Sequence, residues 1–312
     1  MNVDTSGNGR LGIHSIGGFS LIVPNLEEAH DFYDAFGLDV RTTPLGLDLR
    51  TPDGWSWGLV VEGERKKLRH ITFHSYANDS LALRERLIAR GITFEDPPPW
   101  TSDDTGVWFR DPDGLLLQIR AGAKTTLDKV DRVPLPLPCD GVRGASGRSH
   151  RPRVRPVRLS HIMLFCTDVP RSMAFYRDAL GLRLSDCSGD AVAFMHGPHG
   201  SDHHLMAFAK SPGAGLHHFS WDVPTVEEVG LGAMQMAARG FAKGWGVGRH
   251  VLGSNYFFYV ADPWGSFNEY SAYMDFIPAT FDWLADDHPA QDSSYLWAPE
   301  VPAFMRENRE PG

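Results

Sequence analysis

A glutamate, a histidine and a tyrosine in the second half of the chain could share one chemical task. Glu269 follows an aromatic and β-branched run, residues 255–261, and a turn at Asp262-Pro263-Trp264-Gly265. This pattern predicts a buried hairpin, because such side chains favour strands while Pro and Gly favour the turn. A carboxylate there is costly unless it is paired or bound to a cation. His250 and Tyr259 precede Glu269 on the same hairpin and could converge on whatever it holds. Taken alone, an ion-paired or half-exposed glutamate explains the pattern equally well.

The elements that would position these residues occur more than once. The matching segments are 17–40 and 160–184, 68–73 and 216–221, and 109–120 and 260–271. In each half they predict a strand, an amphipathic helix, a second strand and helix, and then strands that end in a hairpin. The first helix of each half is expected to end at a Gly-Leu pair, where glycine suits the position after the last turn. Repetition on this scale indicates duplicated modules.

The two halves differ where the second half carries side chains that bind metals. The second half has His161, His218 and Glu269 where the first half has Gly18, His70 and Gln118. A single strand histidine is more often structural, but three ligand-type residues at matching positions favour a site. Two imidazoles and a carboxylate that leave other positions open form the ligand set of non-haem Fe(II) oxygenases. The first half lacks two of the three ligands and should hold no metal.

His217 is the alternative to its neighbour His218 as a ligand. Successive strand residues point to opposite faces, so only one of the pair can face the metal. The match with His70 selects His218.

Length and charge limit the classes of protein to consider. The chain has 312 residues, which is enough for two domains with cores, and no apolar run approaches a membrane span. The formal charge of −9 argues against nucleic acid, and the basic segment 143–158 is interpreted as a solvated linker. The first ten residues do not resemble a signal peptide, and three cysteines at unhelpful spacings offer neither disulfides nor a zinc site. We therefore expect a cytoplasmic protein that binds neither membranes nor nucleic acids.

These observations divide the chain into four parts. We expect a metal-free N-terminal domain at 11–122, a linker at 123–157, a metal-binding domain at 158–278 and a tail at 279–312. The linker is rich in Pro, Gly and Arg, while the tail carries scattered aromatic residues. Those aromatic side chains should pack onto a domain or a partner subunit, because exposed apolar patches are a liability.

The duplicated unit resembles the vicinal oxygen chelate superfamily over residues 11–277. A two-domain chain with metal ligands in the second half alone is similar to type I extradiol ring-cleaving dioxygenases, of which catechol 2,3-dioxygenase is an example. The most specific part runs from His250 through Tyr259 and the Asp-Pro turn to Glu269. The resemblance implies an α+β fold of two domains, each a pair of βαβββ modules that form a partly open barrel.

The resemblance also implies an activity and the residues that perform it. We expect extradiol cleavage of a catecholic substrate with O2 and Fe(II), or Mn(II), which the ligand set does not distinguish from iron. It implies an acid-base role for His204, with His203 as the alternative, and substrate orientation by His250 and Tyr259. It further suggests a homo-oligomer. After His250 the chain reads VLGSNYF and departs from the biphenyl-type pattern, so the identity of the substrate is not carried over.

Two other functions fit the same superfamily. A glyoxalase-like isomerase would use Zn²⁺, Ni²⁺ or Mn²⁺ with a second carboxylate as base, but Gln118 stands at the matching position and cannot take up a proton. A small-molecule binding protein, like those that sequester drugs, would generally lack the three ligands. Metal analysis with measurement of oxygen uptake separates these functions from a dioxygenase.

Overall fold

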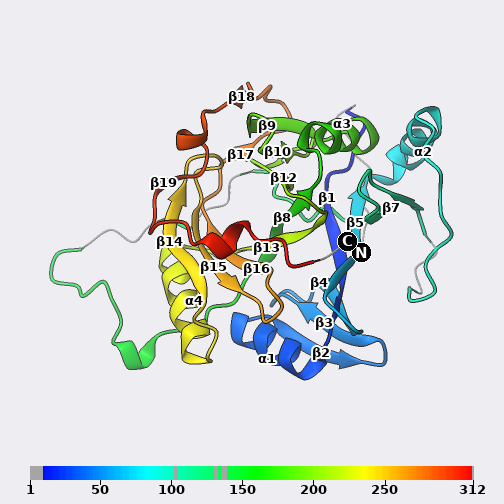
Figure 1. Ribbon diagram of the computed structural model, residues 1–312. Helices are drawn as coiled ribbons and strands as arrows, with labels where there is room; N and C mark the ends of the chain where they lie inside the picture. The colour runs from blue at the N-terminus through cyan, green and yellow to red at the C-terminus, as the bar shows by residue number, and fades with distance from the viewer. Residues whose placement is uncertain (1–9, 102–104, 130–132, 135–138, 311–312) are drawn as a thin grey trace.

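The computed structural model describes residues 10–101, 105–129, 133–134 and 139–310. Within them the strands form a seven-stranded sheet, a ten-stranded sheet and a short two-stranded sheet (Figure 1). The seven-stranded sheet contains β1 (Ser15–Val23), β2 (Asp39–Thr43), β3 (Gly46–Arg50), β4 (Ser56–Glu62), β5 (Lys67–Ser75), β6 (Val107–Arg110) and β7 (Leu116–Ala121). The ten-stranded sheet contains β8 (Arg158–Cys166), β9 (Arg183–Ser188), β10 (Val192–His196), β12 (Met206–Lys210), β13 (Gly215–Asp222), β14 (Gly244–His250), β15 (Tyr256–Ala261), β16 (Phe267–Ala272), β18 (Asp286–Asp287) and β19 (Tyr295–Trp297). The short sheet pairs β11 (Ser201–Asp202) with β17 (Phe276–Ile277).

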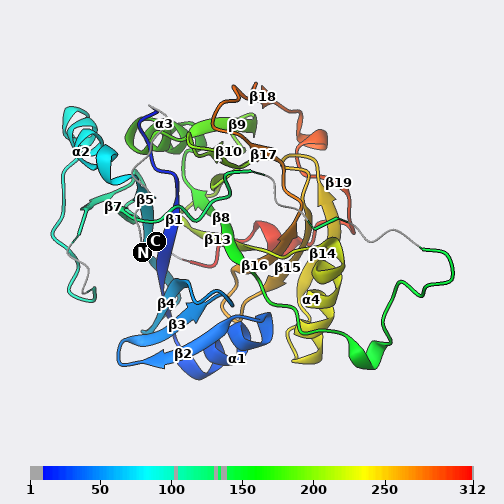
Figure 2. The same ribbon diagram turned by 180° about the vertical axis from the view of Figure 1, so that it is seen from behind.

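The described residues also form four α-helices and four short 3-10 turns. The helices are α1 (Leu26–Phe36), α2 (Ser80–Ala89), α3 (Val169–Leu180) and α4 (Val226–Ala238) among the described residues. The 3-10 turns are η1 (Ala77–Asp79), η2 (Arg148–His150), η3 (Ala290–Asp292) and η4 (Ala303–Arg306). In Figures 1 and 2, α1 and α4 lie side by side at one end of the molecule. No helix within the described ranges is both long and apolar enough to span a bilayer.

The two large sheets share one topology. In the first sheet, β1 and β5 form a central antiparallel pair. On the outer sides of this pair, β4 runs parallel to β1 and β7 runs parallel to β5. In the second sheet, β8 and β13 form the central antiparallel pair. Here β12 runs parallel to β8 and β16 runs parallel to β13. The predicted α+β fold of duplicated modules is therefore confirmed.

Local sequence explains where the first helix of each half begins and ends. Asn25 accepts hydrogen bonds from two main-chain N–H groups of the first turn of α1, and Asp168 accepts one in α3. Gly37 and Gly181 follow the two helices with φ of 103° and 79°, which side chains with a Cβ rarely adopt. The prediction that both helices end at their Gly-Leu pair is confirmed.

The second module of the N-terminal half is shorter than its counterparts. After α2 the described residues contain two strands, β6 and β7, rather than three, and Glu95 forms only an isolated bridge with Trp108. Pro97, Pro98 and Pro99 follow directly, and proline has no N–H to donate to a strand ladder. The bridge marks the place where the third strand would lie.

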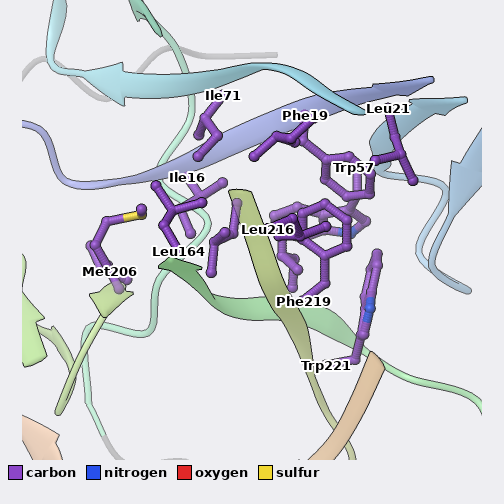
Figure 3. Close-up of a cluster of buried hydrophobic side chains, with 14 of the residues drawn as sticks. Ile16, Phe19, Leu21, Trp57, Ile71, Leu164, Met206, Leu216, Phe219 and Trp221 are labelled. Carbon is purple, nitrogen blue, oxygen red and sulfur yellow. The ribbon is translucent and has the colours of Figure 1, made fainter. Parts of the chain in front are cut away.

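The halves share a continuous hydrophobic core. Figure 3 shows Phe19 of β1 facing Phe219 of β13, and their rings stack with centroids 3.9 Å apart. Phe36 of α1 stacks on Tyr270 of β16 at 4.0 Å, and the Tyr270 hydroxyl donates to the Phe36 carbonyl at 2.7 Å. The apolar side chains that would be exposed in each half alone are thus buried against the other half.

The C-terminal segment packs along the second sheet. The strand β19 pairs with β14, and Met305 in η4 is buried. Further on, the Glu310 carboxylate accepts from the main-chain N–H groups of Leu68 at 2.5 Å and Leu216 at 2.9 Å. These two leucines occupy matching positions in the duplicated strands, so one carboxylate joins both halves.

Part of the predicted linker also has a fixed path. The Val154 N–H donates to the Gln235 side chain of α4 at 2.9 Å, and the chain passes close to that helix (Figure 2). Residues 130–132 and 135–138 of the linker, 102–104 of the N-terminal domain and 311–312 of the tail lie outside the described residues, as do residues 1–9. The exact domain limits stay a prediction.

Candidate metal centre

Strand register brings the predicted ligands onto one face of the second sheet. Ser220 of β13 lies directly opposite His161 of β8 on one side and Glu269 of β16 on the other. Residues that are opposite in a ladder point to the same face, and so do residues two apart in a strand. His218 therefore shares the face of His161 and Glu269, and the small Ser220 between them leaves room for an ion.

The distances between the donor atoms fit a shared ion. His161 Nε2 lies 3.0 Å from His218 Nε2, and Glu269 Oε2 lies 3.3 Å and 3.6 Å from these two atoms. Two nitrogens that bind one ion at about 2.1 Å and at a right angle would lie about 3.0 Å apart. Among the described residues, these three form the group of buried ligand side chains whose atoms all lie within 4.8 Å of one another.

Glu269 is a buried carboxylate in which one oxygen makes no hydrogen bond to a described residue. The side chain is fully buried, and Oε2 has no hydrogen-bond partner in the described structure. Its other oxygen, Oε1, accepts from Asn255 Nδ2 at 3.2 Å. Burial alone would raise the pKa of Glu269, but the His161 and His250 imidazoles outweigh it and hold the pKa well below its usual range. An anionic oxygen without a partner is the environment that a cation satisfies.

His218 is suited to bind a metal as a neutral group. Burial, followed by the neighbouring His217 imidazole, holds the pKa of His218 well below its usual 6.5. A neutral imidazole carries the lone pair that a metal needs. The residues therefore fit a divalent cation in both chemistry and spacing.

His250 and Tyr259 lie next to the carboxylate. Tyr259 is directly opposite Glu269 in the ladder of β15 and β16. The Tyr259 hydroxyl lies 3.0 Å from His250 Nε2, and that nitrogen lies 3.7 Å from Glu269 Oε1. Burial, and then the charge of Glu269, raises the pKa of Tyr259 well above its usual value of 10, so the hydroxyl keeps its proton.

His204 approaches the ligands from the loop between β11 and β12. Its ring centroid lies 4.1 Å from that of His161. Burial, followed by the surrounding imidazoles, holds its pKa well below 6.5. His203, the predicted alternative, instead bridges two groups: its Nε2 lies 2.7 Å from Asp186 Oδ2 and its Nδ1 lies 3.0 Å from His204 Nδ1.

All the predicted site residues line one cavity of about 280 Å³. Its remaining wall is largely apolar and includes Phe194, Trp245 and Leu252. The C-terminal tail contributes Val301 and Met305 to the same wall. The cavity can therefore hold an aromatic ring beside the polar cluster.

The matching place in the first half has no ligand set. There Thr72 lies opposite Gly18 and Gln118, in the register that Ser220 has with His161 and Glu269. The Gln118 amide is occupied, because its Oε1 accepts from Thr72 and its Nε2 donates to the Thr105 carbonyl. A Cβ at Gly18 would lie 2.8 Å from the Trp57 carbonyl oxygen, so this position has no room for a histidine.

Several residues that support the cluster were not predicted from the sequence. Asn255 stands at the start of an aromatic strand, where a buried amide is unusual, and this was a usable signal. Asp186 and Met305 gave no local signal, because their contacts with His203 and His217 join segments that are far apart in the chain.

Comparisons with known proteins agree with this geometry. A family model described as the Glyoxalase/Bleomycin resistance protein/Dioxygenase superfamily matches residues 158–270. Metapyrocatechase 2 of Cupriavidus necator is 51% identical over 301 residues, which cover 96% of this chain and 94% of that protein. An iron-dependent extradiol dioxygenase of Rhodococcus jostii (strain RHA1) is 27% identical over 240 residues, which cover 71% of this chain and 75% of that protein.

A solved structure shows the same fold. The Mn(II)-bound glyoxalase from Novosphingobium aromaticivorans superposes with a TM-score of 0.75 at 23% identity and covers 96% of this chain and 97% of its own. The high identity to a relative of nearly equal length shows the family. The chain belongs to the extradiol ring-cleaving dioxygenases of the vicinal oxygen chelate superfamily.

Proposed function

We propose that this enzyme opens the ring of a catecholic substrate by extradiol cleavage, with O2 as co-substrate and a divalent metal held by His161, His218 and Glu269. Fe(II) is the expected metal, and Mn(II) is the alternative. The observation that carries the proposal is the buried cluster of these three donors, in which Glu269 Oε2 has no hydrogen-bond partner among the described residues. When bound, the metal supplies a Lewis acid for two adjacent substrate oxygens and a path for electrons to O2.

His250 and Tyr259 are proposed to orient the substrate. His250 Nδ1 lies 2.8 Å from the Ser294 carbonyl, which can only accept, so this nitrogen carries a proton. In neutral His250 the other nitrogen, Nε2, is therefore the acceptor for the Tyr259 hydroxyl at 3.0 Å. A substrate oxygen that enters beside Glu269 would meet this pair and be held at one edge of the ring.

His204 is proposed to move the proton. The Asp186 carboxylate accepts from His203 Nε2–H, which leaves His203 Nδ1 as an acceptor for His204 Nδ1–H. His204 Nε2 then presents a lone pair on the cavity side. This lone pair can accept the proton of a substrate hydroxyl, and the imidazole can return the proton later in the reaction.

One experiment separates this function from its rivals. The protein is reconstituted anaerobically with Fe(II) and screened against substituted catechols for oxygen uptake and a yellow ring-opened product. One O2 consumed per catechol supports the dioxygenase. Binding of Zn²⁺ or Ni²⁺ with no uptake would favour an isomerase, and the absence of any bound metal would favour a binding protein.

The predicted oligomer and cellular location belong to the same proposal. We propose a homo-oligomer because the tail exposes large apolar side chains, with Phe281, Leu284 and Trp297 at 53%, 90% and 46% exposure. Light scattering during gel filtration of Leu284→Asp should then show smaller particles than the unchanged protein. Within the described residues, Cys166 and Cys187 form no disulfide, which supports a reducing cytoplasm. Cell fractionation that places the protein elsewhere would contradict this location.

A further inference from the structure

We infer that the C-terminal tail is a working part of the metal centre: the Met305 carbonyl fixes the tautomer of His217, and His217 fixes His218 with a bare Nε2 that can bind the metal. The inference depends on the proposed metal site and not on ring cleavage. It makes His217 a positioning residue rather than a failed ligand.

The first step is the contact between the tail and His217. His217 Nε2 lies 3.0 Å from the Met305 carbonyl oxygen. A carbonyl oxygen can only accept a hydrogen bond, so His217 Nε2 must carry a proton. The imidazole is buried, so a second proton would place a costly charge in the protein interior. The remaining nitrogen, Nδ1, is therefore an acceptor.

The second step is that the tautomer of His217 determines the tautomer of the metal ligand His218. His217 Nδ1 lies 2.7 Å from His218 Nδ1, and one of these two nitrogens must donate. Because His217 Nδ1 is the acceptor, His218 Nδ1 carries the proton. His218 Nε2 is then unprotonated, and it is the atom that lies 3.0 Å from His161 Nε2 and 3.6 Å from Glu269 Oε2. The hydrogen bond fixes the ring and raises its basicity, as partners of metal-binding histidines generally do.

The third step is the anchoring of the tail itself. Trp245 Nε1 donates to the Pro299 carbonyl at 2.9 Å, and the Phe304 ring stacks on Phe267. On the far side, Glu310 accepts from the Leu216 N–H at 2.9 Å. The Met305 carbonyl is thus held from both directions, and Figure 1 shows the red tail running alongside the strands of the second sheet.

The metal-free half provides an internal comparison. Arg69 stands at the position of His217 and His70 at the position of His218. The Arg69 guanidinium lies over the Trp100 ring at 3.8 Å, and His70 Nδ1 has no hydrogen-bond partner among the described residues. Among its described residues, the N-terminal half therefore also lacks the tautomer-fixing contact, which is expected if the contact serves the metal.

The test compares two substitutions of His217. In His217→Gln the side-chain amide can still donate to the Met305 carbonyl and accept from His218, whereas His217→Phe can do neither. We expect the Fe(II) dissociation constant, measured anaerobically by competition with a chelator, to rise about 10- to 100-fold in His217→Phe and less than about threefold in His217→Gln. Arg69→Phe, at the matching position of the other half, is the control and should leave the constant unchanged.

A second measurement keeps the inference open to refutation if His217→Phe folds poorly. Nitrogen-15 NMR of the metal-free unchanged protein should show His218 protonated at Nδ1 and bare at Nε2. A proton on Nε2 would overturn the inference, and so would equal Fe(II) affinity in the two folded variants. If the unchanged protein bound no metal, the proposed centre would fail. Tight metal binding without oxygen uptake would refute the proposed activity and leave this inference standing.

Discussion

Asn255 Nδ2 donates to Glu269 Oε1 over 3.2 Å and leaves Glu269 Oε2 to face the two imidazoles. The same amide donates to Ser271 Oγ at 2.9 Å, so its orientation is fixed. One oxygen of the carboxylate is thereby held in place while the other remains for the metal.

Removal of that amide should weaken the metal site. In Asn255→Leu the carboxylate loses its orienting donor, and we expect the dissociation constant for Fe(II) to rise about tenfold or more. Anaerobic titration against a chelator measures the constant. Asn268→Leu removes a buried amide from the opposite face of β16, where Asn268 accepts a hydrogen bond from Trp221. It should change the free energy of unfolding but not the metal affinity, and similar metal loss in both variants would contradict the role of Asn255.

Loss of any ligand should abolish retention of the metal. His161→Ala and His218→Ala each remove one donor, and Glu269→Gln removes the only carboxylate of the cluster. We expect the purified variants to lose iron on desalting and to show no oxygen uptake, as measured by elemental analysis and an oxygen electrode. His70→Ala changes the matching residue of the first half and should retain iron. Iron loss in that variant would point to a second site.

Replacement of His204 should separate binding from chemistry. His204→Phe keeps the ring volume and all three ligands, so iron content should stay normal. The rate should fall by about 100-fold or more, the range expected when an acid-base group is removed. Turnover at the normal rate would rule out the proposed proton transfer.

Asp186 should act on the rate through the same histidine. Burial opposes the charge on Asp186, but hydrogen bonds from His203, the Asp286 main chain and His288 lower its pKa overall. Asp186→Ala removes the acceptor that fixes the His203 tautomer, so we expect kcat to fall about tenfold with little change in KM or iron content. His288→Ala removes an outer contact of Asp186 and should stay close to the unchanged protein. A change in KM alone would contradict the positioning role.

Stability should fall steeply below pH 6.5 in the metal-free protein. Burial lowers the pKa of His14 and His196 to about 3 and that of His70 to about 4, against 6.5 in the unfolded chain. As the pH falls from 6.5, these histidines become protonated in the unfolded chain but stay neutral in the folded protein. Each such histidine therefore lowers the free energy of unfolding by up to about 1.4 kcal/mol per pH unit.

One buried acid works in the opposite direction. Burial raises the pKa of Asp111 to about 6, so the folded protein takes up this proton first and offsets one histidine between pH 6 and pH 4. Urea unfolding at pH 7.5, 6.5 and 5.5 measures the net slope, which should be shallower in His70→Gln. A stability that is independent of pH over this range would contradict the assigned shifts.

The sequence was most informative where one half could be compared with the other. The alignment of Gly18 with His161 and of Gln118 with Glu269 reappears in the strand register, because Thr72 and Ser220 occupy the same place between them. Alternation along a strand, combined with the match between His218 and His70, favoured His218 over His217 as the ligand. These inferences depend on local periodicity and duplication, which a single sequence contains.

The supporting contacts could not be predicted in the same way. Asp186 reaches His203 across strands, and Met305 reaches His217 from an irregular tail, so neither contact leaves a periodic pattern. The shortened second module was also missed, although Pro97 to Pro99 mark the place where its strand pairing stops. Such features depend on how distant segments dock, which only the folded chain reveals.

The carboxylate of Glu310 bears on how the protein matures during synthesis. It completes hydrogen bonding at the start of both central strands, β5 and β13, yet the ribosome adds it after every strand of either sheet. Neither half can complete the hydrogen bonding of its central strand until Glu310 has been synthesised. The carboxylate that joins the two duplicated modules is therefore added late in synthesis, after the strands of both sheets have been made.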